Sequence, residues 1–435
     1  MIKIRSQQLL KNINFKNLAT ATNSQANNSS YRVVIVGGGS GGIAVSSKLS
    51  QVIDPKQIAI VEPADNHYYQ PLFTFVGAGI KTLNDAKRST ASVIPNGVQW
   101  VKNSVAELNP DQSKVVLADG SSISYDFLVV ATGLENKWDK IKGLQESIGK
   151  NGVVSNYSKD TVESTWKYLS ELKEGNALFT MPSTPIKCAG APQKIAYLAD
   201  DYLREKNLRD RVTVDYFTGI GKIFAIEKYG NQLTKICKSR DIGVHPNSEL
   251  IEIDNVNRVA KFKNLTNGET FDKKYNFLHV TPPMSTSEFV KKSPLANEGG
   301  FVDVDKLTLK HVKFDNVYSL GDVSSLPTSK TAAAITEQSG VLAANLTNAL
   351  QNNDAKPLEY SGYTSCPLIT GKGKLILAEF SGYTGQPLET FPVDQSLERN
   401  SMYILTKDII PEVYWNGLLK GRWSGPGPIR NLWKN

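Results

Sequence analysis

The sequence predicts an α/β protein in which two domains alternate strands with helices and a C-terminal helical region follows. Three observations support this prediction. An apolar strand runs into a glycine loop near residue 37, a second unit of strand, loop, helix and strand begins near residue 176, and the chain after residue 395 is rich in aromatic and basic side chains. With 435 residues, of which 40% are hydrophobic and 21% are charged, the chain is long enough for two or three domains with buried cores.

The first element is the apolar run 33–36, which leads directly into a glycine loop and then into a helical segment, 43–49. The spacing of its glycines is typical of a dinucleotide-binding loop: the first permits a tight turn, the second lets the backbone approach a pyrophosphate, and the third lets helix and strand pack closely. The helix N-terminus presents free N–H groups to the anion. The alternative is a glycine-rich turn in an unrelated α/β sheet. We assign the following residues to a cofactor site: Gly37, Gly39, Ser40, Gly41 and Gly42.

The next predicted strand, 58–61, provides a second check on this loop because it ends at Glu62. An acidic residue at this spacing can accept hydrogen bonds from a ribose 2′-hydroxyl. An aromatic turn at 67–72 then offers a wall for a flat ring, and the Gln70 amide offers hydrogen bonds to it. Both Glu62 and Gln70 therefore join the predicted cofactor site.

Short strands at 101–105 and 114–117 follow in the first unit. An apolar strand, 126–131, ends in a small-residue turn, and a strand of this kind is typical of a parallel sheet that is covered on both faces. The turn brings the chain back near the glycine loop. We therefore add Val105 and Gly133 to the cofactor site.

The second α/β unit has the shape of a nucleotide domain, but its loop differs. Residues 182–192 lack the glycine triplet, and prolines and the pair Lys187–Cys188 stand where a pyrophosphate needs bare backbone. We therefore expect this unit to bind no nicotinamide dinucleotide. Its predicted elements are helices at 163–173 and 195–206 and strands at 176–181 and 212–217.

The chain then returns to the first unit with a strand at 316–320 that ends in Gly321–Asp322. A carboxylate in this place can bind a ribityl hydroxyl. A helix is predicted for 331–350, with Thr328 or Ser329 as its cap. The positive end of that helix and Lys330 can stabilise negative charge on a reduced flavin ring. Three further cofactor residues are predicted here: Asp322, Lys330 and Thr331.

The two ends of the chain differ from the body. Residues 1–30 are rich in basic and hydroxyl side chains and contain no acidic residue, which is typical of a mitochondrial transit peptide; the alternative is a disordered polar tail. The region 351–435 has two predicted helices, 396–408 and 412–423, split by Pro411. Their aromatic and basic residues are typical of helices that lie in a membrane interface. Alternatively, they pack on the core or at a dimer contact.

Charge, cysteines and histidines exclude several classes of function. The net charge of +8 is moderate. The body of the chain has no stripe of basic residues interleaved with aromatics, so the sequence does not indicate nucleic-acid binding. Three cysteines are too few for a disulfide scaffold or a zinc site, and the four histidines show no ligand spacing, so we predict no metal.

Two of the three cysteines are candidates for redox chemistry. Cys188 and Cys366 are each expected in a loop with proline and small residues nearby, whereas Cys237 lies on a predicted helix and is interpreted as structural. A free thiol has a pKa of about 8.5, so the charge of Lys187 is expected to favour a thiolate at Cys188. The residues leave two hypotheses open: a redox pair, or two buried and unreactive cysteines.

Four segments resemble the sulfide:quinone oxidoreductase family in its mitochondrial form. They are 184–194 and 363–368 around the two cysteines, 279–284, and 326–334. The resemblance covers nearly all of residues 31–435. The cysteine segments are specific to that family, whereas the glycine loop is shared with the wider group of flavoproteins that have two dinucleotide-type domains.

The resemblance implies an FAD enzyme that oxidises hydrogen sulfide and reduces ubiquinone, bound peripherally or monotopically to the mitochondrial inner membrane, with a homodimer allowed. Cys188 and Cys366 match the family's redox pair, bridged directly or through an extra sulfur. Sulfide then attacks at Cys366, which keeps a persulfide, and Cys188 leaves as a thiolate. Glutathione or sulfite takes the sulfane sulfur. Val323 stands where some relatives carry a further cysteine, so no third redox centre is expected.

The resemblance also sets the expected domain boundaries. The FAD domain comprises 31–136 and 272–350, and the second Rossmann-like domain, 137–271, carries Cys188. Two other functions stay open. An NADH:quinone oxidoreductase on the same fold is expected to carry a second glycine triplet, and a membrane-docked flavoprotein without catalysis is expected to tolerate loss of the cysteines. Quinone contacts are expected from apolar and aromatic residues near the C-terminal helices, namely Phe380, Phe391 and Tyr403.

Overall fold

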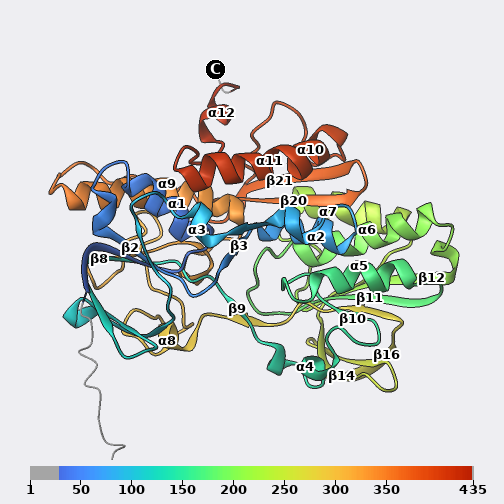
Figure 1. Ribbon diagram of the computed structural model, residues 1–435. Coiled ribbons are helices and arrows are strands. Elements are labelled where there is room, and N and C mark those ends of the chain that lie inside the picture. Colours follow the sequence, from blue (N-terminus) through green and yellow to red (C-terminus); the bar gives the residue numbers. More distant parts are fainter. Residues whose placement is uncertain (1–28, 434–435) are drawn as a thin grey trace, which may run out of the picture.

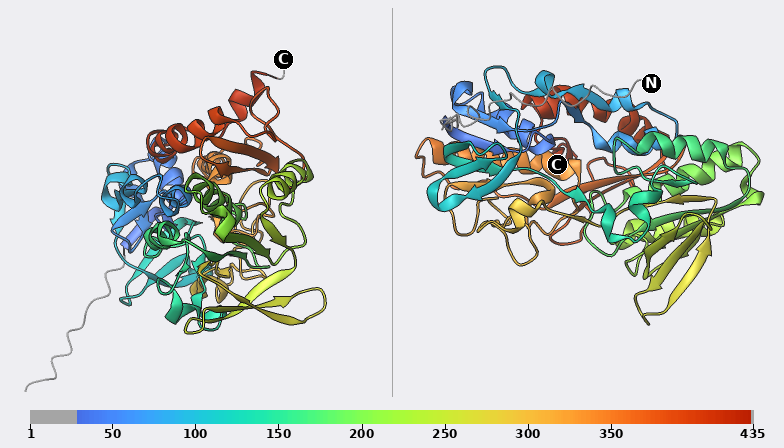
Figure 2. Two further views of the ribbon diagram at one scale, coloured as in Figure 1. Left: turned by 90° about the vertical axis from the view of Figure 1, so that its right-hand side faces the viewer. Right: turned by 60° about the horizontal axis from the view of Figure 1, so that its bottom comes forward.

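The computed structural model describes residues 29–433, so the predicted transit peptide falls almost entirely outside the described residues. Two α/β domains lie side by side, and the C-terminal region lies across both of them (Figure 1). The small sheet of β14 (Ser248–Asp254), β15 (Val259–Asn264) and β16 (Thr270–Lys274) projects from the second domain on the side away from the C-terminal region (Figure 2).

The first domain is built on a mixed sheet of seven described strands in which the glycine-loop strand is central. Strand β1 (Ser29–Val36) runs parallel to β2 (Ile58–Val61) on one side and to β8 (Ser122–Val130) on the other. The β-branched run 33–36 is fully buried between them, as a parallel sheet covered on both faces requires. Strand β19 (Val317–Ser319) joins β8 in parallel, so the domain is discontinuous in sequence as expected.

Helices α1 (Ser40–Leu49) and α9 (Ala332–Leu350) pack against each other and against this sheet. Two sequence expectations need correction here. The expected strand 101–105 is a break between β5 (Gln99–Val101) and β6 (Val105–Asn109), because the Asn103 N–H turns back to the Val101 carbonyl. The cap of α9 is Thr331, whose hydroxyl accepts from the Ala334 N–H at 3.1 Å, and not Thr328 or Ser329.

The second domain contains a parallel five-stranded sheet in the order β10–β17–β11–β12–β13. Its centre is formed by β11 (Gly175–Met181) and β17 (Phe277–His279), beside β12 (Val212–Thr218), β10 (Val153–Val154) and β13 (Gly243–His245). Because β17 pairs with β11, the boundary expected at residue 272 is wrong. The chain leaves the second domain after His279, at the antiparallel pair of β9 (Glu135–Asn136) and β18 (Met284–Ser285). Helices α5 (Val162–Glu171), α6 (Ala191–Glu205) and α7 (Glu227–Ser239) complete the domain.

The C-terminal region begins with a long hairpin of β20 (Tyr363–Gly371) and β21 (Lys374–Ser381). Cys366 lies within β20 opposite Ala378, so the expectation of a loop at Cys366 is wrong. The helical stretch from α10 (Asn400–Ile404) through α11 (Ile410–Glu412) to the turn Leu418–Lys420 is continuous through Pro411, and its last turn ends at Gly421. A π-helical turn, Leu405–Ile409, precedes the proline and widens the backbone, which relieves the clash and the missing donor that otherwise break a helix.

The side chains of this helical stretch divide between the core and the surface. Tyr403, Tyr414 and Trp415 are buried against the first domain, as the alternative of helices packed on the core requires for these three side chains. The exposed apolar side chains of this stretch are Ile404 and Ile409, and Leu432 and Trp433 are exposed beyond it. Among residues 29–433, no helix is both long and apolar enough to cross a bilayer.

The packing of the glycine loop predicts how two glycine replacements change the free energy of unfolding. A Cβ on Gly42 would lie 1.9 Å from the Gly37 carbonyl oxygen, whereas a Cβ on Gly39 would meet no atom within 4 Å. We therefore expect Gly42→Ala to lower the free energy of unfolding of the ligand-free protein by about 3 kcal/mol, the upper end of ordinary overpacking. Gly39→Ala, the matched control, is expected to change it by less than about 0.5 kcal/mol. Urea unfolding measures both values, and equal stabilities would show that the turn is not packed as described.

Candidate active site

The glycine loop is built to expose backbone rather than side chains. Gly37 has φ +104°, donates its N–H to the Val61 carbonyl at 2.9 Å, and leaves no room for a Cβ, which would lie 2.6 Å from the Ala131 oxygen. Gly39 precedes α1 and provides no side-chain cap, so the first turn of the helix keeps its N–H groups for another acceptor. These features fit the pyrophosphate of a dinucleotide.

Glu62 and the turn after β8 border the same loop. The Glu62 carboxylate accepts from the Gly38 N–H and from the Ala64 N–H, each at 2.8 Å. Thr132 lies against Gly37, and its buried hydroxyl has no hydrogen-bond partner within the described part of the chain. Gly133 follows with φ +69° and open space around it. An orphaned buried hydroxyl beside bare backbone fits a bound cofactor, because such a group is costly unless a ligand or water satisfies it.

Two other predicted cofactor residues stand apart from this group. Gln70 is exposed at the start of a short helical turn, Gln70–Leu72. Val105 is half-buried and begins β6, the outermost strand of the first sheet, which β7 (Lys114–Leu117) and β8 separate from β1. The structure therefore brings Glu62 and Gly133 to the glycine loop but does not join Gln70 or Val105 to it.

A second group of predicted residues meets at the start of α9. Asp322, Lys330 and Thr331 line one small pocket together with Gln338. Lys330 donates to the Ser324 carbonyl at 2.6 Å and lies 4.9 Å from the centre of the Phe301 ring. Burial lowers the pKa of Lys330 to about 8, although Asp322 opposes the shift, and burial raises the pKa of Asp322. A half-buried charged pair of this kind can bind polar groups of a flavin.

The cysteine loop is tied directly to this pocket. Cys188 adopts φ +50°, a left-handed conformation that is uncommon for a residue other than glycine. Its N–H donates to the Lys330 carbonyl at 2.6 Å, and its carbonyl accepts from the Ala191 N–H at 2.8 Å. Such strain persists where surrounding bonds fix it, and it is often found at functional sites.

The two candidate cysteines meet, although they are far apart in the sequence. The thiols of Cys188 and Cys366 lie within hydrogen-bonding reach of each other, and each shifts the pKa of the other. Gly190 makes the approach possible, because a Cβ there would lie 3.3 Å from Cys366 Cβ and 3.0 Å from a methyl group of Leu368. Cys366 is fully buried, whereas Cys188 is half-buried. The hairpin β20–β21 thus supplies one sulfur and the second domain supplies the other.

The surroundings make these two sulfurs unequal. The hydrogen bond from Cys366 and the charge of Lys194, whose Nζ lies 3.5 Å from Cys188 Sγ, lower the pKa of Cys188 more than burial raises it. The same hydrogen bond and burial raise the pKa of Cys366. Burial also raises the pKa of Cys237 to about 11, and that thiol contacts the Tyr197 hydroxyl at 3.7 Å. Cys188 is therefore the sulfur that carries negative charge.

The cation beside Cys188 is Lys194 and not Lys187 as the sequence suggested. Burial lowers the pKa of Lys187, and the nearby charges of Asp322 and Glu135, not Cys188, oppose that shift. Lys194 lies in the first turn of α6, only 7% exposed. The helix was expected to begin at residue 195, so Lys194 had no predicted orientation. Once the helix is known to begin at Ala191, the sequence does identify Lys194, because a lysine in the first turn of a helix lies near a cysteine just before that helix.

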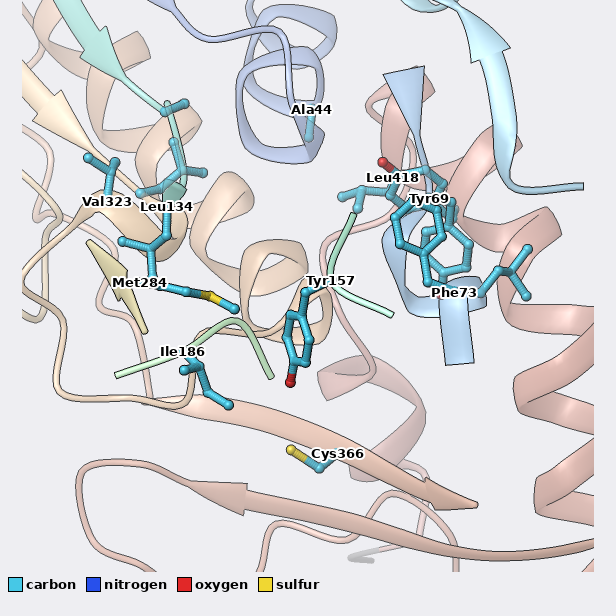
Figure 3. Close-up of a cluster of buried hydrophobic side chains, with 14 of the residues drawn as sticks. Ala44, Tyr69, Phe73, Leu134, Tyr157, Ile186, Met284, Val323, Cys366 and Leu418 are labelled. Carbon is cyan, nitrogen blue, oxygen red and sulfur yellow. The ribbon is translucent and has the colours of Figure 1, made fainter. Parts of the chain in front are cut away.

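A tyrosine that the sequence did not single out completes the site. The Tyr157 hydroxyl donates to the Cys188 carbonyl at 3.4 Å, and the ring is directed toward Cys366 (Figure 3). Burial and the charge of the two cysteines raise the pKa of Tyr157, so it stays protonated as a hydrogen-bond donor. Ile186 and Met284 provide an apolar wall beside it (Figure 3).

The corresponding loop edge of the second domain is closed by its own chain. A Cβ on Gly219 would lie 2.4 Å from the Ser183 backbone nitrogen, so the loops after β11 and β12 are in backbone contact. Ser183 also donates its N–H and its hydroxyl to Glu249, at 2.7 and 2.8 Å. This contact occupies the place where a second dinucleotide would need bare backbone.

The two lysines near Cys188 allow a matched test of its charge. A lowered pKa means that the thiolate is present above that pKa and is lost as pH falls through it, so we expect alkylation of Cys188 in the reduced protein to begin below the usual thiol value of about 8.5. Lys194→Met should move the midpoint of the pH profile upward, whereas Lys187→Met should leave it unchanged. Iodoacetamide labelling of the Cys188 peptide, followed by mass spectrometry, measures the midpoint. A larger shift in Lys187→Met would contradict the assignment.

Comparison with known proteins identifies the family of the chain. Residues 31–176 match the family model of the pyridine nucleotide-disulphide oxidoreductases. The chain is 48% identical to the mitochondrial sulfide:quinone oxidoreductase of Mus musculus over 404 residues, which is 92% of this chain and 89% of that protein.

Two solved structures show the same fold at lower identity. A chain in the Tetrahymena thermophila mitochondrial ATP synthase has a TM-score of 0.78 at 24% identity and covers 93% of this chain and 99% of its own. The sulfide:quinone oxidoreductase of Aquifex aeolicus has a TM-score of 0.75 at 18% identity and covers 90% and 92%. The identity to the mouse protein over nearly the full length of both chains decides the family: this chain belongs to the mitochondrial sulfide:quinone oxidoreductases.

Proposed function

We propose that the protein oxidises hydrogen sulfide at the Cys188–Cys366 pair, holds the electrons on FAD and passes them to ubiquinone. One observation carries the proposal. Two cysteines from different parts of the chain lie together beside Gly190, and a buried lysine lies 3.5 Å from one of them. Membership of the sulfide:quinone oxidoreductases supports the same substrate and acceptor.

The difference in pKa between the two thiols supports Cys366 as the sulfur that is attacked and Cys188 as the leaving group. With the pair oxidised, hydrosulfide attacks Cys366 Sγ, a new sulfur–sulfur bond forms there, and the bond to Cys188 breaks. Cys188 leaves as the thiolate, because thiol–disulfide exchange favours the leaving thiol with the lower pKa. Lys194 and the Tyr157 hydroxyl are placed to stabilise that charge. Hydrosulfide is small enough to suit attack at the buried Cys366 sulfur.

The second step removes the added sulfur. The outer sulfur of the Cys366 persulfide passes to a nucleophilic acceptor such as glutathione or sulfite, and Cys366 is left as a thiolate. The two cysteines then close again and give up two electrons. FAD, when bound, supplies the two-electron store between the cysteines and the quinone. No other oxidant is required.

The residues present fit that cofactor. The glycine loop, Glu62 and the orphaned Thr132 hydroxyl suit the dinucleotide half, and Asp322 and Lys330 suit the flavin half. The backbone bond from Cys188 to Lys330 supports a flavin ring close to the thiolate. The roles of Gln70 and Val105 remain predictions.

The surface of the C-terminal region supports peripheral attachment to a membrane. Ile404 and Ile409 are about half exposed, at 45% and 50%, on the same helical stretch, and the Lys81–Asp408 ion pair, at 3.0 Å, ties that stretch to the first domain. Phe380, Phe391 and Tyr403 remain candidate quinone contacts. The mitochondrial relatives and the composition of residues 1–30 support a mitochondrial location, and attachment to the inner membrane remains a prediction.

Single replacement of each cysteine tests the proposal. Cys188→Ser and Cys366→Ser should each reduce sulfide-dependent quinone reduction to the background rate, because one thiol can neither accept the sulfur nor close the pair. Cys237→Ala is the control, since Cys237 is buried on α7 with the Tyr197 hydroxyl as its partner, and it should keep its turnover. Anaerobic assays of the three variants with a soluble quinone provide the rates. Normal turnover in either serine variant would reject the pair.

A further inference from the structure

The C-terminal helical stretch reaches the glycine loop through one buried side chain. Tyr414 is 3% exposed, and its hydroxyl lies 2.7 Å from Ser40 Oγ and 2.5 Å from His67 Nε2. The other ring nitrogen of His67, Nδ1, lies 3.0 Å from the Gly38 carbonyl oxygen. The three side chains therefore form one chain of hydrogen bonds that begins and ends on the glycine loop.

The direction of each hydrogen bond in this chain is fixed. A carbonyl oxygen only accepts, so Nδ1 of His67 carries a proton and donates it to Gly38. Burial lowers the pKa of His67 to about 4, so the ring is neutral and Nε2 can only accept. The Tyr414 hydroxyl must then donate to Nε2, and Ser40 must donate to the Tyr414 oxygen. Ser40 consequently has no proton left to offer to a phosphate.

The contact continues along the whole of α1. The Ser47 hydroxyl donates to the Leu419 carbonyl at 2.6 Å, and Lys48 donates to the Gly421 carbonyl at 3.2 Å. The Tyr414 ring also packs against Tyr69 in a tilted arrangement, with 4.2 Å between centroids. The helix whose N-terminus faces the predicted pyrophosphate is thus held from its first turn to its last by the C-terminal stretch.

We infer that the C-terminal stretch is part of the dinucleotide site, with Tyr414 as a positioning residue that fixes the glycine loop through Ser40 and His67. The backbone N–H groups of the loop then bind the phosphate, and the Ser40 side chain serves the loop and not the ligand. The inference rests on the proposed FAD site, and it makes retention of the flavin depend on docking of a distant segment of the chain.

Tyr414→Phe tests the inference at the middle of the hydrogen-bond chain. We expect it to speed the release of flavin from the holoenzyme about tenfold, since it leaves a buried donor and a buried acceptor unpaired. Stopped-flow flavin fluorescence measures the release. The matched control is Tyr125→Phe, which removes a buried hydroxyl that has no partner among the described residues and should release flavin at the wild-type rate.

A double-mutant cycle separates positioning of the loop from direct phosphate binding. If Ser40 acts only through Tyr414, Ser40→Ala and the double variant Ser40→Ala/Tyr414→Phe should release flavin no faster than Tyr414→Phe. Effects that multiply in the double variant, or a wild-type rate in Tyr414→Phe, would overturn the inference.

A readout without flavin keeps this test independent of the proposed function. In the flavin-free protein, Tyr414→Phe should speed hydrogen exchange of the backbone amides at residues 38–43, and Tyr125→Phe should not. Wild-type exchange in Tyr414→Phe would refute the positioning role. A wild-type protein purified without flavin would count against the proposed function, and the exchange comparison would still decide the inference.

Discussion

The close approach of the Cys188 loop to strand β20 is the contact on which the proposed chemistry depends. It joins three separate parts of the chain, because the loop belongs to the second domain, β20 to the C-terminal region, and the carbonyl that holds the Cys188 N–H to the first domain. Gly190 permits the approach, and the left-handed backbone at Cys188 aims its sulfur across it. A shift in any of the three parts would separate the sulfurs.

The same contact explains why the second dinucleotide-type domain has a different use. In the first domain, the glycine backbone and the N-terminus of α1 present N–H groups that suit a pyrophosphate. In the second, the loop after β11 packs on Gly219 and extends toward β20, so its helix α6 contributes Lys194 to a sulfur instead of N–H groups to a phosphate. One architecture thus serves two chemistries through the residues of one loop, and function follows from the site and not from the fold.

Local patterns in the sequence predicted the strands and the glycine loop, because burial on both faces selects the β-branched runs at 33–36 and 58–61. Contacts between distant segments were not predictable in this way. Lys194 and Tyr157 could be assigned to the site only from the positions of helix α6 and the cysteine loop in the structure. Strand β17 belongs to the second sheet, although it follows a separate three-stranded sheet in the chain. Pro411 was expected to break a helix, but a π-helical turn accommodates it.

Anaerobic titration of the purified holoenzyme tests the central claim most directly, namely that electrons reach the flavin from sulfide through the cysteine pair. The flavin absorbance should bleach on addition of sulfide, recover on addition of quinone, and remain unchanged on addition of NADH. Bleaching by NADH together with no response to sulfide would contradict the account.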